Sequence, residues 1–184
     1  MKFFIETYGC QMNVSDSDNL IQLLLTNNFT RCDKADDADI IIINTCAVRT
    51  SAEERIWGRL GFYKSLKNKR DFILVLIGCI AQEKKEDLFR DFPFIDIVIG
   101  TGETSGAALA IMHYMDEHVQ KAYTNEDSHV FLPESPSLTE PFSAYINITH
   151  GCDNYCTYCI VPFVRGRMKS RKADEIIREI NALY

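Results

Sequence analysis

Three cysteines of the segment HGCDNYCTYC, residues 150–159, lie close enough in sequence to bind one metal centre. Cys152, Cys156 and Cys159, here called the second cysteine set, have the spacing C-x3-C-x2-C and no fourth cysteine beside them. His150 could complete a zinc site of three cysteines and one histidine. Structural zinc sites usually take their ligands as separated pairs, however, so the spacing favours an iron–sulfur cluster with one iron open for a substrate or cofactor.

Three further cysteines, Cys10, Cys46 and Cys79, each follow a strand-like stretch: ETYGC, IIINTC and LVLIGC. We call them the first cysteine set. Ligands of open parallel sheets bind beyond the carboxyl ends of the strands, so these thiols could converge there and select zinc, copper(I) or an iron–sulfur cluster. The alternative is that they are small buried apolar residues. Cys32 follows no such strand, and we interpret it as structural or incidental.

The elements that must position these cysteines alternate between strand and helix over the first 118 residues. Short apolar runs indicate buried strands, and longer stretches with helical spacing of apolar residues indicate helices. The strand-like stretches are 2–9, 39–44, 72–78 and 95–100, and the helical ones are 14–28, 50–70, 82–92 and 103–118. This alternation predicts an α/β domain at 1–118 with a doubly wound, flavodoxin-like parallel sheet.

The remaining residues have a different character. Residues 119–143 contain three of the five prolines and are predicted to be a linker. A strand at 144–150, the cysteine loop and a helix at 172–184 then follow, and they are too few to bury a core. We therefore expect 144–184 to begin a second domain that is truncated here, with little fixed structure beyond about residue 145 in the absence of a cluster.

Composition limits the classes of protein that fit. No apolar run approaches the ~18 residues of a membrane span, and no signal peptide is recognisable, so we expect a cytoplasmic protein. Seven cysteines in a reducing compartment indicate metal or redox chemistry rather than disulfides. A net charge of −6 argues against nucleic-acid binding over the whole chain. The basic stretch 165–172 is either a solvated loop or a contact to phosphates or to a cofactor.

The second cysteine set, with the aromatic residue Tyr158 before its last cysteine, resembles the signature of radical S-adenosylmethionine (SAM) enzymes. The run GCDNYCTYCIVPFVRGRMKSR, with TYGCQMNVSDS, NTCAVRTSAEERIWGRLG and GCIAQ, resembles the methylthiotransferase family over essentially the whole chain. The resemblance implies a flavodoxin-like N-terminal domain at 1–118, a linker at 119–143, and at 144–184 the first strand, loop and helix of a truncated radical-SAM (β/α) barrel.

The resemblance also implies two [4Fe–4S] clusters, SAM and a role for each cysteine set. The first set (Cys10, Cys46, Cys79) would ligate an auxiliary cluster that delivers sulfur. The second set (Cys152, Cys156, Cys159) would ligate the cluster that cleaves SAM to a radical, with Tyr158 beside the adenine of SAM. An unactivated C–H bond requires such a cofactor, because no acidic or basic side chain removes its hydrogen.

The stretch TYGCQMN, with Gln11, Met12 and Asn13, resembles the branch that methylthiolates carbon 2 of N6-dimethylallyladenosine at position 37 of tRNA. Sister enzymes act on threonylcarbamoyladenosine in tRNA or on a ribosomal-protein aspartate, and a non-catalytic zinc- or cluster-binding module is an alternative of another class. The expected partners are tRNA and an electron donor such as flavodoxin or ferredoxin. We expect a monomer without membrane contact, inactive as these 184 residues alone.

Overall fold

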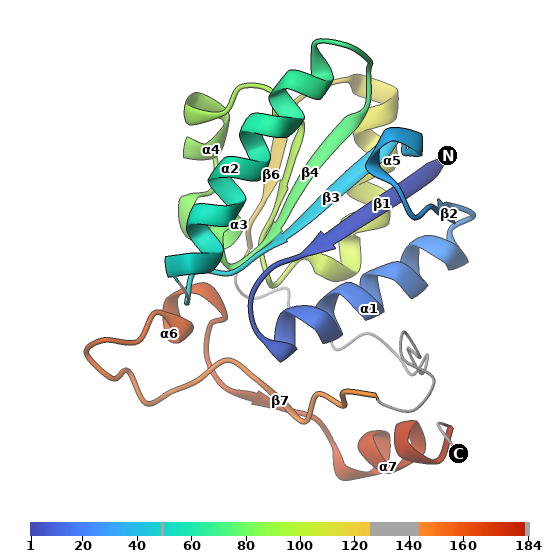
Figure 1. The fold of residues 1–184 in the computed structure, drawn as a ribbon. Helices are drawn as coiled ribbons and strands as arrows, with labels where there is room; N and C mark the ends of the chain where they lie inside the picture. The colour runs from blue at the N-terminus through green and yellow to red at the C-terminus, as the bar shows by residue number, and fades with distance from the viewer. Residues whose placement is uncertain (49, 126–143, 183–184) are drawn as a thin grey trace.

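Six parallel strands form the central sheet of the protein (Figure 1). The computed structural model describes residues 1–48, 50–125 and 144–182. The strand order is β2-β1-β3-β4-β5-β6, and every neighbouring pair is parallel. The strands are β1 (Lys2–Thr7), β2 (Thr30–Arg31), β3 (Ile40–Thr45), β4 (Ile73–Gly78), β5 (Ile97–Ile99) and β6 (Lys121–Tyr123). The predicted α/β class and the parallel sheet are confirmed.

Helices connect the strands and cover both faces of the sheet (Figure 1). They are α1 (Gln11–Thr26), α2 (Thr50–Lys67), α3 (Cys79–Lys84), α4 (Asp87–Asp91) and α5 (Ala107–Glu117), with short 3-10 turns at Ala35–Asp37 and Thr104–Gly106. The expectation of one helix at 82–92 is wrong. The chain breaks between α3 and α4 because Lys85 adopts a positive φ of 49°, which no helix interior permits.

Two apolar cores lie on the two faces of the sheet. Successive strand residues point to opposite faces, so Ile40 and Ile42 pack with α1 and α5, whereas Ile41 and Ile43 pack with α2, α3 and α4. All residues of β3 and β4 are buried, as expected of strands covered on both faces. The cores therefore fix the register of the strands whose ends carry the first cysteine set.

The structure differs from the expected linker at its beginning. Lys121–Tyr123, within the predicted 119–143, form the edge strand β6 in register with Ile97–Ile99 of β5. The amide of Gly100 also donates to the carbonyl oxygen of Tyr123 at 2.7 Å. Residues 126–143 lie outside the described residues, and the division of the chain into two domains stays a prediction.

Residues 144–182 pack beside the carboxyl edge of the sheet (Figure 1). They contain an antiparallel pair, β7 (Thr149–His150) and β8 (Lys169–Ser170), and the helices α6 (Val161–Val164) and α7 (Ala173–Ala182). The expectation of little fixed structure beyond residue 145 is therefore wrong, and the strand predicted at 144–150 is shorter. Direct contacts to earlier residues of the chain hold the segment: Asn147 Nδ2 donates to Ser15 Oγ at 3.0 Å, and Thr101 Oγ1 donates to the carbonyl oxygen of Val164.

Helices in the described part of the chain are all too short or too polar to cross a membrane.

Candidate metal centre at the carboxyl edge of the sheet

The first cysteine set lies where the carboxyl ends of three neighbouring strands meet. Cys10 is the N-cap of α1 after β1, Cys46 follows β3 directly, and Cys79 begins α3 directly after β4. Because β1, β3 and β4 are adjacent and parallel, the chain returns to the same edge each time. Cys46 and Cys79 are buried and Cys10 is half-buried.

A buried polar network holds the backbone around these thiols. Asn13 Nδ2 donates to the carbonyl oxygens of Tyr8 (3.0 Å) and Thr45 (2.8 Å), which joins the loop before α1 to the end of β3. Asn44 Nδ2 donates back to the carbonyl oxygen of Asn13 at 2.9 Å. Thr45 Oγ1 donates to the carbonyl oxygen of Ile77 at 2.6 Å, which joins β3 to β4. The three cysteine positions are thereby fixed relative to one another.

Gly9 allows Cys10 and Cys46 to approach closely. Its φ of 126° is a conformation that favours glycine, and a Cβ at this position would lie 2.4 Å from Cys46 Cβ and 2.9 Å from Cys46 Sγ. Any larger residue at position 9 would therefore push the loop of Cys10 away from Cys46. The sequence motif YGC has its glycine for a steric reason.

The pKa values of the thiols differ because their surroundings differ. A hydrogen bond from Cys46 lowers the pKa of Cys10 to about 5, against the opposing effect of burial and with help from the amides of Asn13 and Met12 and from Arg165. Burial raises the pKa of Cys79, and nearby Arg165 only partly offsets it. At neutral pH the site therefore contains a thiolate at Cys10 and a thiol at Cys79, and binding of a metal would release the remaining protons.

Arg165 enters this site from the segment that follows the second cysteine set. Its Nη2 donates to Asp16 Oδ2 at 2.8 Å and to Asn13 Oδ1 at 3.1 Å. Burial opposes the charge on Arg165, but its interactions with the Asp16 carboxylate and with Cys79 and Cys10 outweigh burial and raise its pKa. Nη1 of the same side chain is buried and has no hydrogen-bond partner among the described residues.

The donor set of this site consists of three thiols with a cation beside them. Among the described residues, no three His, Cys, Asp or Glu side chains are arranged to hold one metal ion. The first set instead offers three thiols from three strand ends, one of them deprotonated, with a cation beside them. Three soft thiolates are the ligand type of iron–sulfur clusters, and the unpaired N–H of Arg165 could serve an inorganic sulfide. The residues therefore fit such a cluster.

The second cysteine set lies in an open loop. Cys156 is exposed, Cys152 and Cys159 are half-buried, and the ring of Tyr158 is 90% exposed. The amide of Cys152 donates to the carbonyl oxygen of Gly166 at 3.1 Å, and that of Cys159 donates to the carbonyl oxygen of Cys156 at 2.9 Å. The loop is thus anchored at Cys152 and contains a turn from Cys156 to Cys159, and only Cys156 of the three cysteines is exposed.

Sequence reasoning missed the residues that connect the two regions. Arg165 and Arg171 belong to the basic stretch 165–172, which we expected to be solvated or to contact phosphates or a cofactor. Arg165 instead binds Asp16, and Arg171 binds Glu179 and donates to the carbonyl oxygen of Asn147. Asp16 follows Asn13 by about one helical turn, so the two side chains lie on the same face of α1. This spacing of an amide and a carboxylate was the only sequence pattern that could have indicated a binding site for the cation of Arg165.

Two of the remaining sequence expectations concern Cys32 and His150. Cys32 lies beside the beginning of β1, where its Sγ is 3.4 Å from the carbonyl oxygen of Phe3. Burial raises the pKa of its thiol. His150 is buried in β7. Cys32 thus packs as a structural residue, outside the first set.

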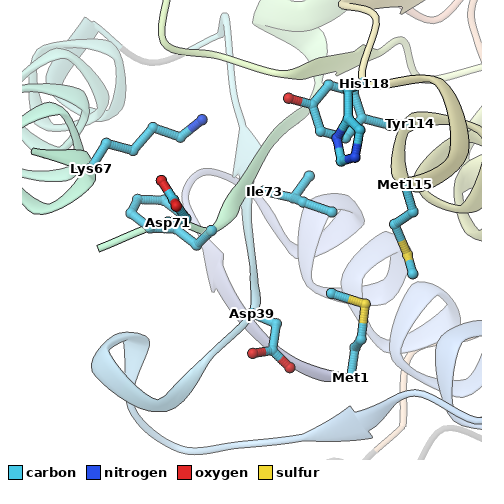
Figure 2. Close-up of a pocket in the computed structure, with 9 residues that line it drawn as sticks. Met1, Asp39, Lys67, Asp71, Ile73, Tyr114, Met115 and His118 are labelled. Carbon is cyan, nitrogen blue, oxygen red and sulfur yellow. The ribbon is translucent and has the colours of Figure 1, made fainter. Parts of the chain in front are cut away.

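A pocket of about 570 Å³ lies at the opposite, amino-terminal edge of the sheet (Figure 2). Its lining includes Met1, Asp39, Lys67, Tyr114 and His118, and it contains none of the cysteines. Lys67 forms an ion pair with the buried Asp96, to whose Oδ1 the hydroxyl of Tyr114 donates at 2.7 Å. This edge is thus organised around a buried carboxylate, and the thiols lie at the other edge.

The fold and the site together define a doubly wound α/β protein with three thiols gathered at the carboxyl edge of its sheet. Residues 2–100 match the uncharacterized protein family UPF0004. This match covers more than half of the chain, so the chain belongs to that family. The matched range contains the first cysteine set and five of the six strands of the sheet.

Curated relatives resemble the chain over nearly its whole length. Proteins named tRNA-2-methylthio-N(6)-dimethylallyladenosine synthase from Treponema denticola and Dictyoglomus thermophilum are 42% and 41% identical over 194 and 188 residues. These alignments include 100% and 99% of this chain but 43% and 42% of the relatives. A protein of the same name from Caldicellulosiruptor saccharolyticus is 41% identical over 193 residues. The chain spans about two fifths of the length of these relatives.

Proposed function

We propose that the chain is part of an enzyme that methylthiolates tRNA, with N6-dimethylallyladenosine as the modified nucleoside. The observation that carries this proposal is the 42% identity over the entire chain to a protein named for that synthesis. The similarity extends through both cysteine sets, so it includes the residues that the resemblance assigns to chemistry. The grouped thiols at the sheet edge support the same function, because sulfur insertion requires a site that can hold sulfur.

Each cysteine set has a distinct role in this proposal. The first set holds an auxiliary [4Fe–4S] cluster, which Cys46 and Cys79 bind from buried positions away from bulk water. The second set holds the cluster that binds SAM, and its open loop leaves room for a cofactor beside Tyr158. When bound, the two clusters and SAM would supply the radical and the sulfur, with one electron from a donor such as flavodoxin or ferredoxin.

The residues of the chain contribute position and charge to this chemistry. Asn13, Asn44 and Thr45 fix the three strand ends, so that the thiols of the first set keep one geometry. Cys79 is almost wholly buried, and Arg165 lies beside it, so bulk water has little access to this thiol. Exclusion of water protects a reactive sulfur species from hydrolysis and side reactions.

The substrate is tested by mass spectrometry of tRNA nucleosides from a strain that lacks the full-length gene. We expect loss of the 2-methylthio form of N6-dimethylallyladenosine and accumulation of its unmodified precursor. The full-length gene should restore the product, whereas variants with alanine at Cys10, Cys46 or Cys79 should not. Unchanged nucleosides in the deletion strain would contradict the assigned substrate, and loss of another methylthio nucleoside would assign a sister enzyme.

The clusters are tested by anaerobic reconstitution of the full-length protein with iron and sulfide. Two [4Fe–4S] clusters predict about eight irons per chain and a broad absorption of thiolate-ligated iron. Alanine at the three cysteines of either set should remove about half of the iron. One tightly bound zinc and no iron would favour a non-catalytic module over an enzyme.

A further inference from the structure

Arg165 joins the two cysteine regions of the chain. Along the sequence it follows Cys159 of the second set, but its guanidinium lies among residues that surround the first set. Its side chain is 6% exposed, in a stretch whose neighbour Arg167 is exposed. A long cationic side chain is rarely buried in this way unless it is paired.

The contacts of Arg165 place it directly beside a thiol. Asn13 Oδ1 accepts a hydrogen bond from Arg165 Nη2 at 3.1 Å, and the same oxygen lies 3.4 Å from Cys10 Sγ. The guanidinium also interacts directly with the side chain of Cys79. Arg165 therefore contacts or adjoins two of the three cysteines of the first set.

The hydrogen bonds of Arg165 are incomplete. Nη2 reaches Asp16 and Asn13, and the guanidinium also interacts with the Cys79 thiol, but Nη1 is buried with no hydrogen-bond partner of good geometry among the described residues. A guanidinium has five N–H donors, and a buried donor without an acceptor destabilises the protein. The buried position of the Arg165 guanidinium is therefore explained best by an acceptor that binds at the first cysteine set. The acceptor must be anionic, because three thiolates and their bound sulfides would bring excess negative charge to this edge.

Docking of the segment does not by itself require a cation. Thr101 and Ser15 already hold Val164 and Asn147 through neutral hydrogen bonds. A well-packed apolar side chain at position 165 would cover the edge without the cost of burying a charge. The charge of Arg165 therefore indicates a role toward the anionic site beneath it.

We propose that Arg165 is a positioning residue that binds the anionic group held by Cys10, Cys46 and Cys79, and so couples the loading of that site to the placement of the second cysteine set. The inference rests on the proposed function, since that function puts a cluster at the first set. Coupling between two sites is reciprocal. A loaded first set thus holds the segment of Arg165 more tightly, and a docked segment holds the cluster more tightly.

The first test measures iron retention in the full-length protein with alanine at Cys152, Cys156 and Cys159, so that the first set alone holds a cluster. After anaerobic reconstitution, the protein is titrated with an iron chelator. Arg165→Gln should lower retention about 10- to 100-fold, the usual effect of removing an outer hydrogen bond of a metal site. Arg165→Lys keeps the charge and should restore part of the retention. Arg167→Gln removes an equal charge from an exposed neighbour and should change nothing.

The second test measures the reduction potential of the same cluster by redox titration followed by electron paramagnetic resonance. Removal of a nearby positive charge disfavours the reduced, more negative state, so Arg165→Gln should shift the potential to a more negative value. Arg165→Lys should stay near the parent. A side chain that acted only as a cover would admit water when shortened and shift the potential in the opposite direction.

The outcomes separate this inference from the function on which it rests. A parent protein that binds no iron at the first set would overturn the proposed function and the inference together. Equal retention and equal potential in the parent and Arg165→Gln would overturn the inference alone, as would a shift of the potential to a more positive value. Circular dichroism of the metal-free variants controls for misfolding, and Arg165→Lys provides the comparison if Arg165→Gln does not fold.

Discussion

Asn13 is fully buried, and its side-chain amide binds three parts of the chain at once. The amide contacts Tyr8 and Thr45 on two neighbouring strand ends through Nδ2 and Arg165 through Oδ1. An amide of this kind has two donors and one acceptor oxygen, which matches the two carbonyls and the guanidinium around it. The position of Cys10 relative to Cys46 therefore depends on one side chain that is not itself a candidate ligand.

Asn13→Ala should lower the free energy of unfolding by about 1–3 kcal/mol, because it leaves buried carbonyl oxygens without donors. Urea unfolding of the metal-free protein measures the change. Gln11→Ala, on an exposed position of the same helical turn, should stay within about 0.5 kcal/mol of the parent. Equal stability of the two variants would show that water replaces the amide.

The sequence predicted which cysteines come together at the site, but it did not predict the polar residues that surround them. The convergence of Cys10, Cys46 and Cys79 follows from the rule that parallel strands end at one edge. Asn13 stood out only as part of a branch-like motif, and nothing in the sequence indicated its hydrogen bonds. The sequence could not place Arg165 at the first cysteine set. Its contact to Asn13 joins residues 152 positions apart, and no periodic pattern encodes a contact of that range.

At the scale of elements, the turn from β4 into α3 requires a glycine. Gly78 has a φ of 95°, and a Cβ there would lie 2.6 Å from both Asn44 Oδ1 and the carbonyl oxygen of Thr45. Gly78→Ala should therefore destabilise the protein by about 1–3 kcal/mol. Gly58 in α2 is exposed with open space around it, so Gly58→Ala should stabilise by about 0.5–1 kcal/mol. Thermal unfolding of both variants tests this prediction, since the melting temperature should fall for Gly78→Ala and rise for Gly58→Ala.

The amino-terminal edge of the sheet is held by a buried carboxylate between elements. Asp96 accepts hydrogen bonds from the amide of Leu74 and the hydroxyl of Tyr114 at 2.7 Å each, and it pairs with Lys67. Burial, and then the hydrogen bond and charge of Asp96, raise the pKa of Tyr114. The contribution of Tyr114 to stability is thus complete below its unfolded pKa near 10 and is lost as the pH rises above it.

Tyr114→Phe should destabilise the protein by about 1 kcal/mol at pH 7, through loss of one hydrogen bond. The difference between parent and variant should shrink as the pH rises above about 10, since the unfolded tyrosine ionises there. Urea unfolding at a series of pH values measures it. Tyr145→Phe, on a largely exposed side chain, is the control and should show little difference at any pH. A constant difference across this range would contradict the linkage.

Long elements were predictable from the sequence, and short ones were not. β3 and β4 were evident because both are continuous apolar runs. β2 has two residues and β6 has three, too few for any periodicity, so the first went unseen and the second was placed in a linker. The break at Lys85 was not evident either, because a lysine with positive φ has no sequence signature.

At the scale of the whole molecule, residues 144–182 are held against the α/β sheet and its helices through a few polar contacts. One of these contacts is the ion pair of Arg165 and Asp16, whose side chains are 6% and 20% exposed. Asp16→Asn removes a charge-assisted hydrogen bond of about 1.5–3 kcal/mol, so amide exchange over 147–170 should accelerate by about tenfold or more. Hydrogen–deuterium exchange with mass spectrometry measures the rate. Asp36→Asn, on an exposed carboxylate, should leave it unchanged.

The cover over the first cysteine set comes late in the chain, and this sets an order of events during synthesis. Domains fold in the order in which the ribosome releases them, at ~5–20 residues per second. All three thiols leave the ribosome with β1–β4, whereas Val164 and Arg165 follow on the order of ten seconds later. On the proposed function, the nascent protein thus has an interval in which the thiols are open to an iron donor. A chain that is not loaded in that interval would then have Arg165 already placed beside Cys10 and Cys79 when the metal enters.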